Sequence, residues 1–443
     1  MAKSYAEAIR LLSTRSKARN NHSNQHQKPR SNNHCMREWL QLLGHDLEDF
    51  NVIHVTGTKG KGSTCAFTEN LLRIHFQRMR TSIKTGLYTS PHLQTERERI
   101  RINFKPITEE MFTKYFFQVW ETLEGTSMPY LPGYLQLLAI LSIHVFRNEG
   151  VGIAVYEVHA GGRYDATNIF RRPIACGFTP IGPDHIPLLG QNVEDIAWHK
   201  SGIMKHGTPA FSAFQEKGVK TVLEYEANKV GSPLSFIETP QRSTKRLVAA
   251  ELSNLSLAIN LANTYLTSES LDDNDIVDCI NQYEWPGRFE LIDRGNCRWY
   301  LDIAHNETSI PVALAWFQNS AQEYETDTRH RYTHILIFGS PAGRDAAELA
   351  SLMVQSCKNH SFFFDLVILT AYKRRVDGNK IFDQDAAKLH ERAWKSADRS
   401  PTVVISPSVK DSLTIAQQQG SIQTLITGSS HLISNAYCHL HDQ

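Results

Sequence analysis

The stretch between residues 51 and 76 most strongly constrains how this chain can fold. A short apolar run at 51–55 leads into a loop with three glycines, two lysines and a Ser-Thr pair. Residues 64–76 then carry apolar side chains at helical spacing. Such a strand–loop–helix unit is typical of the opening of an α/β fold. Because glycines let backbone N–H groups converge on an anion and the helix N-terminus adds a positive dipole end, the stretch predicts a phosphate-binding loop.

The loop reads Gly57-Thr58-Lys59-Gly60-Lys61-Gly62-Ser63 and departs from strict Walker A spacing, because Gly62 separates the Gly60-Lys61 pair from Ser63. A plain glycine-rich turn is the alternative, although such turns rarely carry two lysines and a Ser-Thr pair. We therefore expect Lys61 to place a positive charge on a phosphate and a hydroxyl here, that of Ser63, to ligate Mg²⁺.

Strand and helix patterns alternate along the rest of the chain. Apolar runs at 152–158 and 174–178 are typical of buried parallel strands. A breaker cluster, Trp285-Pro286-Gly287-Arg288, precedes a second α/β series that runs to residue 427. We therefore predict two domains, residues 1–284 and residues 285–443. Helical spacing before the cluster recurs at 111–123, 133–146, 193–201, 217–228, 252–266 and 272–283.

Composition limits the classes of partner and the location. The 443 residues include 47 Lys and Arg against 46 Asp and Glu, which gives a formal charge of +1. This balance offers no argument for a nucleic acid or an acidic membrane as partner. No apolar run reaches the ~18–20 residues that a membrane span requires. The seven cysteines are scattered, as in reduced intracellular proteins, so we expect a cytoplasmic protein.

Motifs along almost the whole chain resemble the folylpolyglutamate synthases, within the wider Mur ligase family. The phosphate loop departs from Walker A spacing in the same way as that family's loop. The resemblance implies an α/β protein with a Mur ligase-type P-loop ATPase domain followed by a smaller Rossmann-like C-terminal domain. The other matching motifs are Thr89-Ser90-Pro91-His92-Leu93, 97–103, Glu157-Val158 with 161–168, Asp184-His185, 196–203, 285–289, 302–306, Gly343-Arg344-Asp345 and Thr427-Gly428-Ser429.

The resemblance also implies an ATP-dependent ligase that joins a carboxylate to an amine. In the family the γ-phosphate of ATP moves to the substrate carboxylate, and the amine of glutamate then displaces phosphate from the acyl phosphate. The expected ligands are a folate-like carboxylate, glutamate, ATP and Mg²⁺ at two sites. A monomer in the cytoplasm is expected, with a mitochondrial form as the alternative.

Individual side chains receive roles from the same resemblance. Glu157 follows an apolar strand, where open α/β sheets place ligands, although a strand-end glutamate is otherwise a cap or an ion-pair partner. Lys200, otherwise a solvated lysine, matches a lysine that the family carbamylates. The implied catalytic residues are Lys61, His185 and Lys200; the metal ligands Ser63, Ser90, Glu157 and His185; the ATP-binding residues Gly57, Thr58, Lys59, Gly60, Lys61, Gly62, Ser63, Asn254, Arg288, Asp302 and His305; and the substrate-binding residues Ser90, Pro91, His92 and Ser429.

Three departures from the family's pattern fall beside these positions. His159 and Ile303 stand where the family usually carries glycine, and Ala250-Glu251 replaces a His-Gln pair. They leave the phosphate loop and Glu157 intact, so ATP use and ligation are expected to be retained. The acceptor stays open between a folate and another carboxylate, acted on by a diverged ligase of the same chemistry. A catalytically inactive nucleotide-binding protein is the third alternative.

Overall fold

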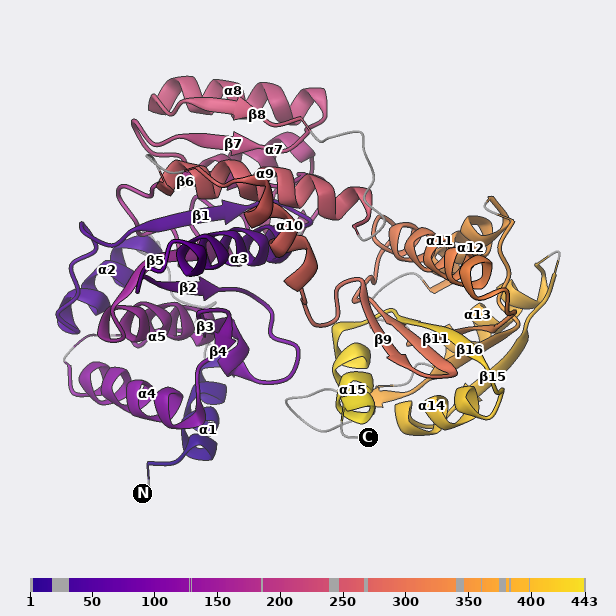
Figure 1. Ribbon diagram of the computed structural model, residues 1–443. Coiled ribbons are helices and arrows are strands. Elements are labelled where there is room, and N and C mark those ends of the chain that lie inside the picture. Colours follow the sequence, from indigo (N-terminus) through magenta and orange to yellow (C-terminus); the bar gives the residue numbers. More distant parts are fainter. Residues whose placement is uncertain are drawn as a thin grey trace. The chain divides into compact units, whose positions relative to one another are not determined.

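The two α/β units of the chain are Met1–Tyr283 and Glu284–Gln443, each with its own parallel-rich sheet (Figure 1). The sequence placed the boundary after residue 284. The structure is a computed structural model, and it describes residues 3–17, 32–126, 128, 130–184, 186–238, 247–266, 270–339, 346–359, 361–373, 380–381, 384–397 and 399–441.

The described part of the first unit contains an eight-stranded sheet in the order β4-β3-β2-β5-β1-β6-β7-β8. All neighbouring pairs are parallel except β2 with β3 and β3 with β4. The strands are β1 (Val52–Thr56), β2 (Lys84–Tyr88), β3 (Ile100–Ile102), β4 (Lys105–Pro106), β5 (Val151–Glu157), β6 (Ala175–Phe178), β7 (Ala210–Ser212) and β8 (Leu234–Phe236).

The alternation of side chains along β6 shows which helices cover each face of the sheet. Cys176 and Phe178 pack with helices α7 and α8, while the intervening Gly177 points the other way, because side chains alternate across a strand. A Cβ added at Gly177 would lie 2.8 Å from Leu261 of α9, so α9 packs closely on the opposite face. The helices are α1 (Tyr5–Lys17), α2 (Asn32–Leu42), α3 (Lys61–Arg78), α4 (Glu109–Glu124), α5 (Tyr134–Asn148), α6 (Ile186–Leu189), α7 (Val193–Ser201), α8 (Lys217–Val230), α9 (Ala249–Leu266) and α10 (Asp273–Gln282), with a 3₁₀ helix η2 (Glu96–Arg99).

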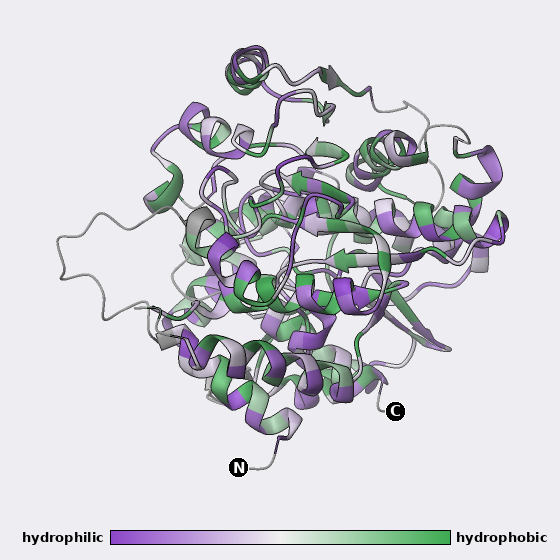
Figure 2. Cartoon of the chain, turned by 90° about the vertical axis from the view of Figure 1, so that its left-hand side faces the viewer, coloured by the Kyte–Doolittle hydropathy of each residue, from purple (hydrophilic) through white to green (hydrophobic). Residues whose placement is uncertain are grey.

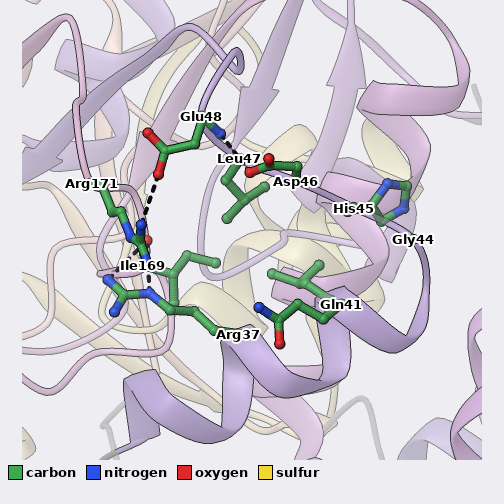
Figure 3. Close-up of a pocket in the computed structure, with 10 residues that line it drawn as sticks. Arg37, Gln41, Gly44, His45, Asp46, Leu47, Glu48, Ile169 and Arg171 are labelled. Atoms are coloured by element: carbon green, nitrogen blue, oxygen red, sulfur yellow. Dashed lines mark hydrogen bonds and ion pairs between the residues drawn. The ribbon is translucent and has the colours of Figure 1, made fainter.

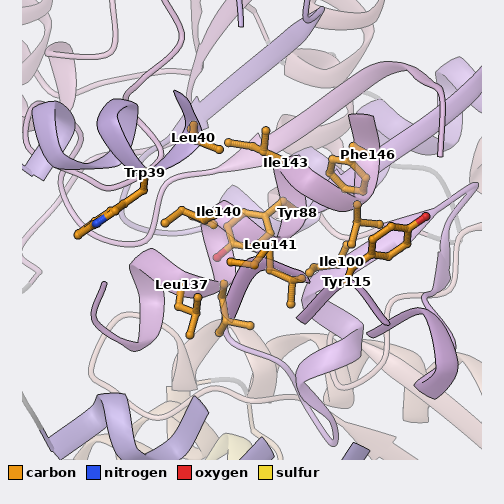
Figure 4. Close-up of a cluster of buried hydrophobic side chains, with 14 of the residues drawn as sticks. Trp39, Leu40, Tyr88, Ile100, Tyr115, Leu137, Ile140, Leu141, Ile143 and Phe146 are labelled. Atoms are coloured by element: carbon orange, nitrogen blue, oxygen red, sulfur yellow. The ribbon is translucent and has the colours of Figure 1, made fainter. Parts of the chain in front are cut away.

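A large apolar cluster joins α1, α2, α4 and α5 to the sheet, and Figure 4 shows its centre. Ten consecutive residues of α5, 137–146, are buried, so this helix is enclosed on all sides. Trp39 of α2, Tyr88 of β2 and Tyr156 of β5 pack in the same cluster. Figure 2 shows that many other helices carry both hydrophobic and hydrophilic residues, as half-buried amphipathic helices do.

The second unit contains, among its described residues, a six-stranded sheet in the order β15-β12-β11-β16-β10-β9. Only β9 is antiparallel to its neighbour. Its strands are β9 (Glu290–Arg294), β10 (Cys297–Leu301), β11 (Thr333–Phe338), β12 (Leu366–Thr370), β15 (Thr402–Ser406) and β16 (Ile422–Thr427), beside a β13 (Tyr372–Lys373) and β14 (Lys380–Ile381) hairpin. Its helices are α11 (Ile310–Thr328), α12 (Ala346–Asn359), α13 (Gln384–Lys395), α14 (Val409–Gln417) and α15 (Ser430–His441).

The predicted α/β class is confirmed, and each segment predicted as a helix from its apolar spacing is a helix. The pattern missed short strands, since β7 and β8 have three residues each and are too short for a periodic signal. No helix in the described ranges is long and apolar enough to cross a membrane.

A buried ion cluster fixes α10 against α3. Both carboxylate oxygens of Asp275 are engaged: Arg78 donates from Nε and NH2 at 2.7 and 2.8 Å, and His75 Nδ1 lies 2.9 Å away. Burial raises the pKa of this carboxyl, but the hydrogen bonds from Arg78 and His75 outweigh it and lower the pKa to about 2. The charged form is therefore the one that the fold stabilises.

We predict that Asp275→Asn lowers the free energy of unfolding by about 2–3 kcal/mol at pH 7, because Arg78 loses its anion. Because the folded pKa lies below the ordinary ~3.9, the wild-type contribution is complete above pH ~4 and disappears as the pH falls from ~4 to ~2. Urea unfolding across that range measures both effects. The exposed Asp273→Asn, on the same helix turn, is the control, and equal losses in the two variants would contradict the assignment.

Candidate active site

The phosphate loop leaves the sheet at the carboxyl end of β1 and enters α3 with two residues at positive φ. Gly57 has φ 146° and Gly60 has φ 85°, in the region that side-chain-bearing residues avoid. A Cβ at Gly57 would overlap the Thr179 side chain, and one at Gly60 would overlap the amide of Asn254. Asn254 Oδ1 also accepts a hydrogen bond from Thr64 at 3.3 Å. The predicted nucleotide ligand Asn254 therefore supports the loop directly.

Backbone amides of the loop divide into two groups. Thr58 and Lys59 donate their N–H groups to the carbonyl of Pro180 at 3.0 and 3.4 Å, and the Thr58 hydroxyl donates to Gly182 at 2.9 Å. These amides hold the loop against the segment after β6. The amides of residues 61–63 belong to the first turn of α3, where N–H groups have no acceptor within the helix. They are the ones suited to a phosphate.

Two lysines converge on one backbone oxygen in this loop. Lys61 Nζ donates to the carbonyl of Gly57 at 3.0 Å, and Lys200 Nζ donates to the same oxygen at 2.6 Å. Lys200 is 1% exposed at the end of α7. Burial, and then the charge of Lys61, lower the pKa of Lys200 to about 7. A substantial fraction of this amine is therefore uncharged at neutral pH.

Glu157 ends β5 beside the phosphate loop and is 4% exposed. Its Oε2 accepts the backbone N–H of Ser90 at 2.8 Å, so the predicted metal ligands Glu157 and Ser90 adjoin. Burial and the charge of Glu157 both raise the pKa of the Cys65 thiol, which keeps that group neutral. His185 and the Gly343-Arg344-Asp345 motif lie outside the described residues.

The departure at His159 creates a buried network that the sequence did not predict. The His159 Nε2 lies 2.7 Å from the Tyr88 hydroxyl, and its Nδ1 lies 3.4 Å from an oxygen of Asp165. Burial raises the pKa of Asp165, but His159 and the N–H groups of Ala160 and Thr167 outweigh it and lower the pKa. The histidine thus has a partner on each side and joins the end of β2 to the turn after β5.

The predicted substrate loop, Ser90 to His92, is held by the residues of η2. The Glu98 carboxylate accepts the N–H groups of residues 93, 94 and 95 at 2.6–2.9 Å. Arg99 accepts the Thr89 N–H on its carbonyl at 3.1 Å and donates its Nε to His92 Nδ1 at 2.8 Å. Glu98 and Arg99 belong to the matching motif at 97–103, but neither residue was assigned a role of its own from the sequence.

In the second unit Asp302 connects two turns. Its carboxylate accepts the N–H of Phe289 at 3.1 Å and that of Ala304 at 2.8 Å. The first turn carries Arg288 and the second carries His305, whose Nδ1 lies 2.8 Å from the Ile303 carbonyl. Asp302 therefore positions both predicted nucleotide ligands.

Two further positions support helix ends. The Ser429 hydroxyl accepts the His431 N–H at 3.2 Å, at the start of α15. Glu251 accepts the Val248 N–H at 3.2 Å, at the start of α9, so this departure from the family's pattern caps a helix.

A surface hollow of about 460 Å³ lies elsewhere on the first unit (Figure 3). It is lined by Arg37, His45, Glu48 and Arg171 among others, beside the segments that precede β1 and β6. Arg37 donates to the Ile169 carbonyl, and Arg171 pairs with Glu48 at 3.0 Å. Ligands of open α/β sheets bind at the carboxyl ends of strands, so this hollow is not the phosphate site.

Comparison with known proteins gives consistent relatives. A mitochondrial folylpolyglutamate synthase from Cricetulus griseus is 34% identical, covering 98% of this chain and 81% of its own length. The Neurospora crassa folylpolyglutamate synthase is 33% identical over 90% of this chain and 84% of its own, and the human mitochondrial one is 34% identical over 91% and 76%. No family model matches the chain.

Solved structures share the fold. The Thermotoga maritima folylpolyglutamate synthase has a TM-score of 0.77 and 21% identity over 99% of this chain and 96% of its own. The Mycobacterium tuberculosis synthase, complexed with ADP and AMPPCP, has a TM-score of 0.78 and 19% identity over 98% and 99%. Both agree with the α/β fold described above.

We predict that Gly60→Ala weakens AMPPCP binding by about 10-fold or more, because the new Cβ meets Asn254 and the backbone is strained. Isothermal titration measures the affinity. Gly150→Ala is the matched control, since Gly150 also has a positive φ, 68°, but has no atom within 4 Å of the added carbon. Equal affinity of Gly60→Ala and wild type would contradict this view of the loop.

Proposed function

The chain belongs to the folylpolyglutamate synthase family of ATP-dependent ligases, which add glutamate to folates, and from this premise we propose how its residues share the reaction. The observation that carries the proposal is the pair of lysines at the phosphate loop, the half-buried Lys61 and the buried Lys200, next to Glu157 at the end of the adjoining strand. This arrangement places the Lys61 cation where phosphates collect and the Glu157 carboxylate where a divalent cation is required.

Phosphoryl transfer comes first in the proposed sequence. An oxygen of the folate γ-carboxylate attacks the γ-phosphorus of ATP, the bond to the bridging oxygen breaks, and ADP leaves. Lys61 and the first-turn amides of α3 hold the negative charge of the phosphates during this step. From the second unit, Arg288 and His305 are the proposed phosphate and nucleotide ligands, with Asp302 holding their turns. Ser429 is proposed on the glutamate side.

Amide formation follows. The glutamate nitrogen attacks the acyl carbon, phosphate leaves, and the nitrogen loses a proton. The rigid loop at Ser90, Pro91 and His92 is proposed to hold the acceptor next to the phosphate loop. The Ser90 N–H donates a hydrogen bond to Glu157, and this contact supports the proposal that the loop holds the acceptor in a fixed position relative to the nucleotide.

The residues present fit Mg²⁺. Glu157 offers a buried carboxylate, and Ser63 and Ser90 offer hydroxyl oxygens, which are the hard donors that this ion prefers. No group of three His, Cys, Asp or Glu side chains among the described residues could hold a metal ion. When bound, Mg²⁺ would neutralise phosphate charge, with Glu157, Ser63, Ser90 and the undescribed His185 as its proposed ligands.

The acceptor is tested by incubating the protein with Mg-ATP, glutamate and a panel of carboxylates that includes tetrahydrofolate. We expect ADP release that depends on tetrahydrofolate and a product heavier by one glutamyl residue, measured by mass spectrometry. Lys61→Ala should lower kcat/KM at least about 100-fold, because its charge acts on the transferring phosphoryl group. ADP release only with a non-folate acid would favour the diverged ligase, and no acceptor-dependent release would favour an inactive nucleotide-binding protein.

We further propose that Lys200 is carbamylated. Its amine nitrogen attacks CO₂ and loses a proton, which gives a carbamate anion. Only the uncharged amine reacts, and its pKa of about 7 makes that form available at physiological pH. A cytoplasmic monomer is the simplest setting for the enzyme, although two of its relatives are named as mitochondrial.

We predict that carbamate formation at fixed dissolved CO₂ increases from pH 6 to pH 8 and then levels off, as Lys200 loses its proton. A ¹³C resonance of the carbamate after addition of ¹³C-bicarbonate measures it. Lys200→Arg should remove the signal and most of the activity while it keeps a cation at the site. A carbamate-free wild type with full turnover would refute the modification.

A further inference from the structure

Arg99 is a buried cation that lacks an anionic partner among the described residues. It is 6% exposed at the end of η2. Its Nε donates to His92 Nδ1 at 2.8 Å, whereas its NH1 is buried and has no hydrogen-bond partner in the described chain. A buried charge without a counter-charge is costly unless a ligand supplies what is missing. Native structures rarely leave such a group without a reason.

Other buried arginines among the described residues show that burial alone does not explain why Arg99 has no anionic partner. Arg298 is 9% exposed and lies 3.1 Å from Asp293. Arg101, 8% exposed, donates to the carbonyls of residues 98 and 104. Arg97, on the same short helix as Arg99, also has a buried nitrogen without a hydrogen bond, its Nε, but it lies 3.9 Å from the Glu109 carboxylate and donates to the carbonyl of residue 107 at 2.9 Å. Arg99 therefore differs in having a neutral imidazole nitrogen, not a carboxylate or a carbonyl, as its acceptor.

The part of the Arg99 guanidinium group that does not contact His92 indicates which kind of anion would fit it. Since His92 occupies Nε, the NH1 and NH2 end remains, with two parallel N–H bonds that match the two oxygens of one carboxylate. The Tyr134 ring centre lies 5.9 Å from the guanidinium carbon. Burial raises the pKa of the Tyr88 hydroxyl and the charge of Arg99 opposes it, so the cation also acts on Tyr88. The Tyr134 ring thus lies near the guanidinium group that would bind a carboxylate.

Arg99 is also connected to the proposed reaction site through backbone hydrogen bonds. Its carbonyl accepts the N–H of Thr89 at 3.1 Å, and the next residue, Ser90, donates to Glu157. The guanidinium contacts His92, which belongs to the proposed acceptor loop and not to the phosphate loop. The expected anion is therefore part of the acceptor.

We propose that Arg99 binds the α-carboxylate of the acceptor's terminal glutamyl residue, the carboxylate that does not react. This inference rests on the proposed function. The α- and γ-carboxylates belong to the same residue, so a ligase that activates only the γ-carboxylate must hold the other one in place. Arg99 is then a specificity-determining residue, and His92 positions its guanidinium.

The test uses tetrahydrofolate and its α-carboxamide analogue, in which the γ-carboxylate is intact. With wild-type protein, the amide should lower kcat/KM by about 10- to 100-fold. Arg99→Gln should lose a similar factor with tetrahydrofolate, mainly through a higher acceptor KM, and should discriminate little between the two acceptors. The KM for ATP should be unchanged. Arg97→Gln is the matched control, since it removes a positive charge from the same helix and should keep the wild-type discrimination.

Discrimination that is equal in wild type and Arg99→Gln would overturn the assignment, as would a variant whose ATP KM rises while its acceptor KM does not. If Arg99→Gln does not fold, judged by thermal unfolding, Arg99→Lys is measured instead. It keeps the charge but not the paired N–H bonds, and full wild-type discrimination in it would also overturn the proposal. A wild-type protein that ligates neither acceptor defeats the proposed function itself, whereas turnover of tetrahydrofolate with unchanged discrimination defeats only this inference.

Discussion

The carbonyl oxygen of Gly57 is the point on which the site in the first unit depends. It accepts hydrogen bonds from Lys61, in the next turn of chain, and from Lys200, on a helix far along the sequence. The Pro180 carbonyl holds the same loop from the neighbouring strand through two amides. A loop tied at both places has its first-turn amides aimed before any phosphate arrives, so little reorganisation is left for the reaction. The pKa of Lys200 is lowered because the amine is buried at this place and because the charge of Lys61 is close to it.

At this site, polar groups whose hydrogen bonds are all made within the protein support the fold, whereas a group with an unused hydrogen-bond donor is suited to bind a ligand. His159 replaces a family glycine, yet it has Tyr88 on one side and Asp165 on the other, so its polarity is used within the fold. Arg99 lies at the end of η2, and among the described residues its guanidinium has His92 alone as a hydrogen-bond partner. Both ring nitrogens of His159 thus have partners within the protein, whereas Arg99 NH1 has no hydrogen-bond partner among the described residues. The net charge of +1 is therefore an average over local charges, some of which are paired within the fold, as Asp165 is, and some of which are proposed to bind a ligand, as Arg99 is.

The fold was largely predictable because its long elements repeat their apolar side chains. The enclosed helix α5 and the fully buried strand β1 have unbroken apolar or periodic patterns, and both were predicted close to their observed bounds. The edge strands β4, β8 and β9 and the helices α14 and α15 were missed, whereas the edge strand β15 was predicted. Short segments such as β8 become strands because a neighbour supplies hydrogen bonds, and a partner in another part of the sequence leaves no local pattern.

The sequence by itself determined the glycine-rich loop, the class of fold and the family, because these depend on residue type and order along the chain. Only the tertiary structure decided which groups at the site are already satisfied. It showed that the Thr58 and Lys59 amides hold the loop, that Asp302 joins two turns, and that Arg99 has no anionic partner among the described residues. The physical reason is that hydrogen-bond partners and burial set the cost of each polar group, and both come from residues distant in the chain.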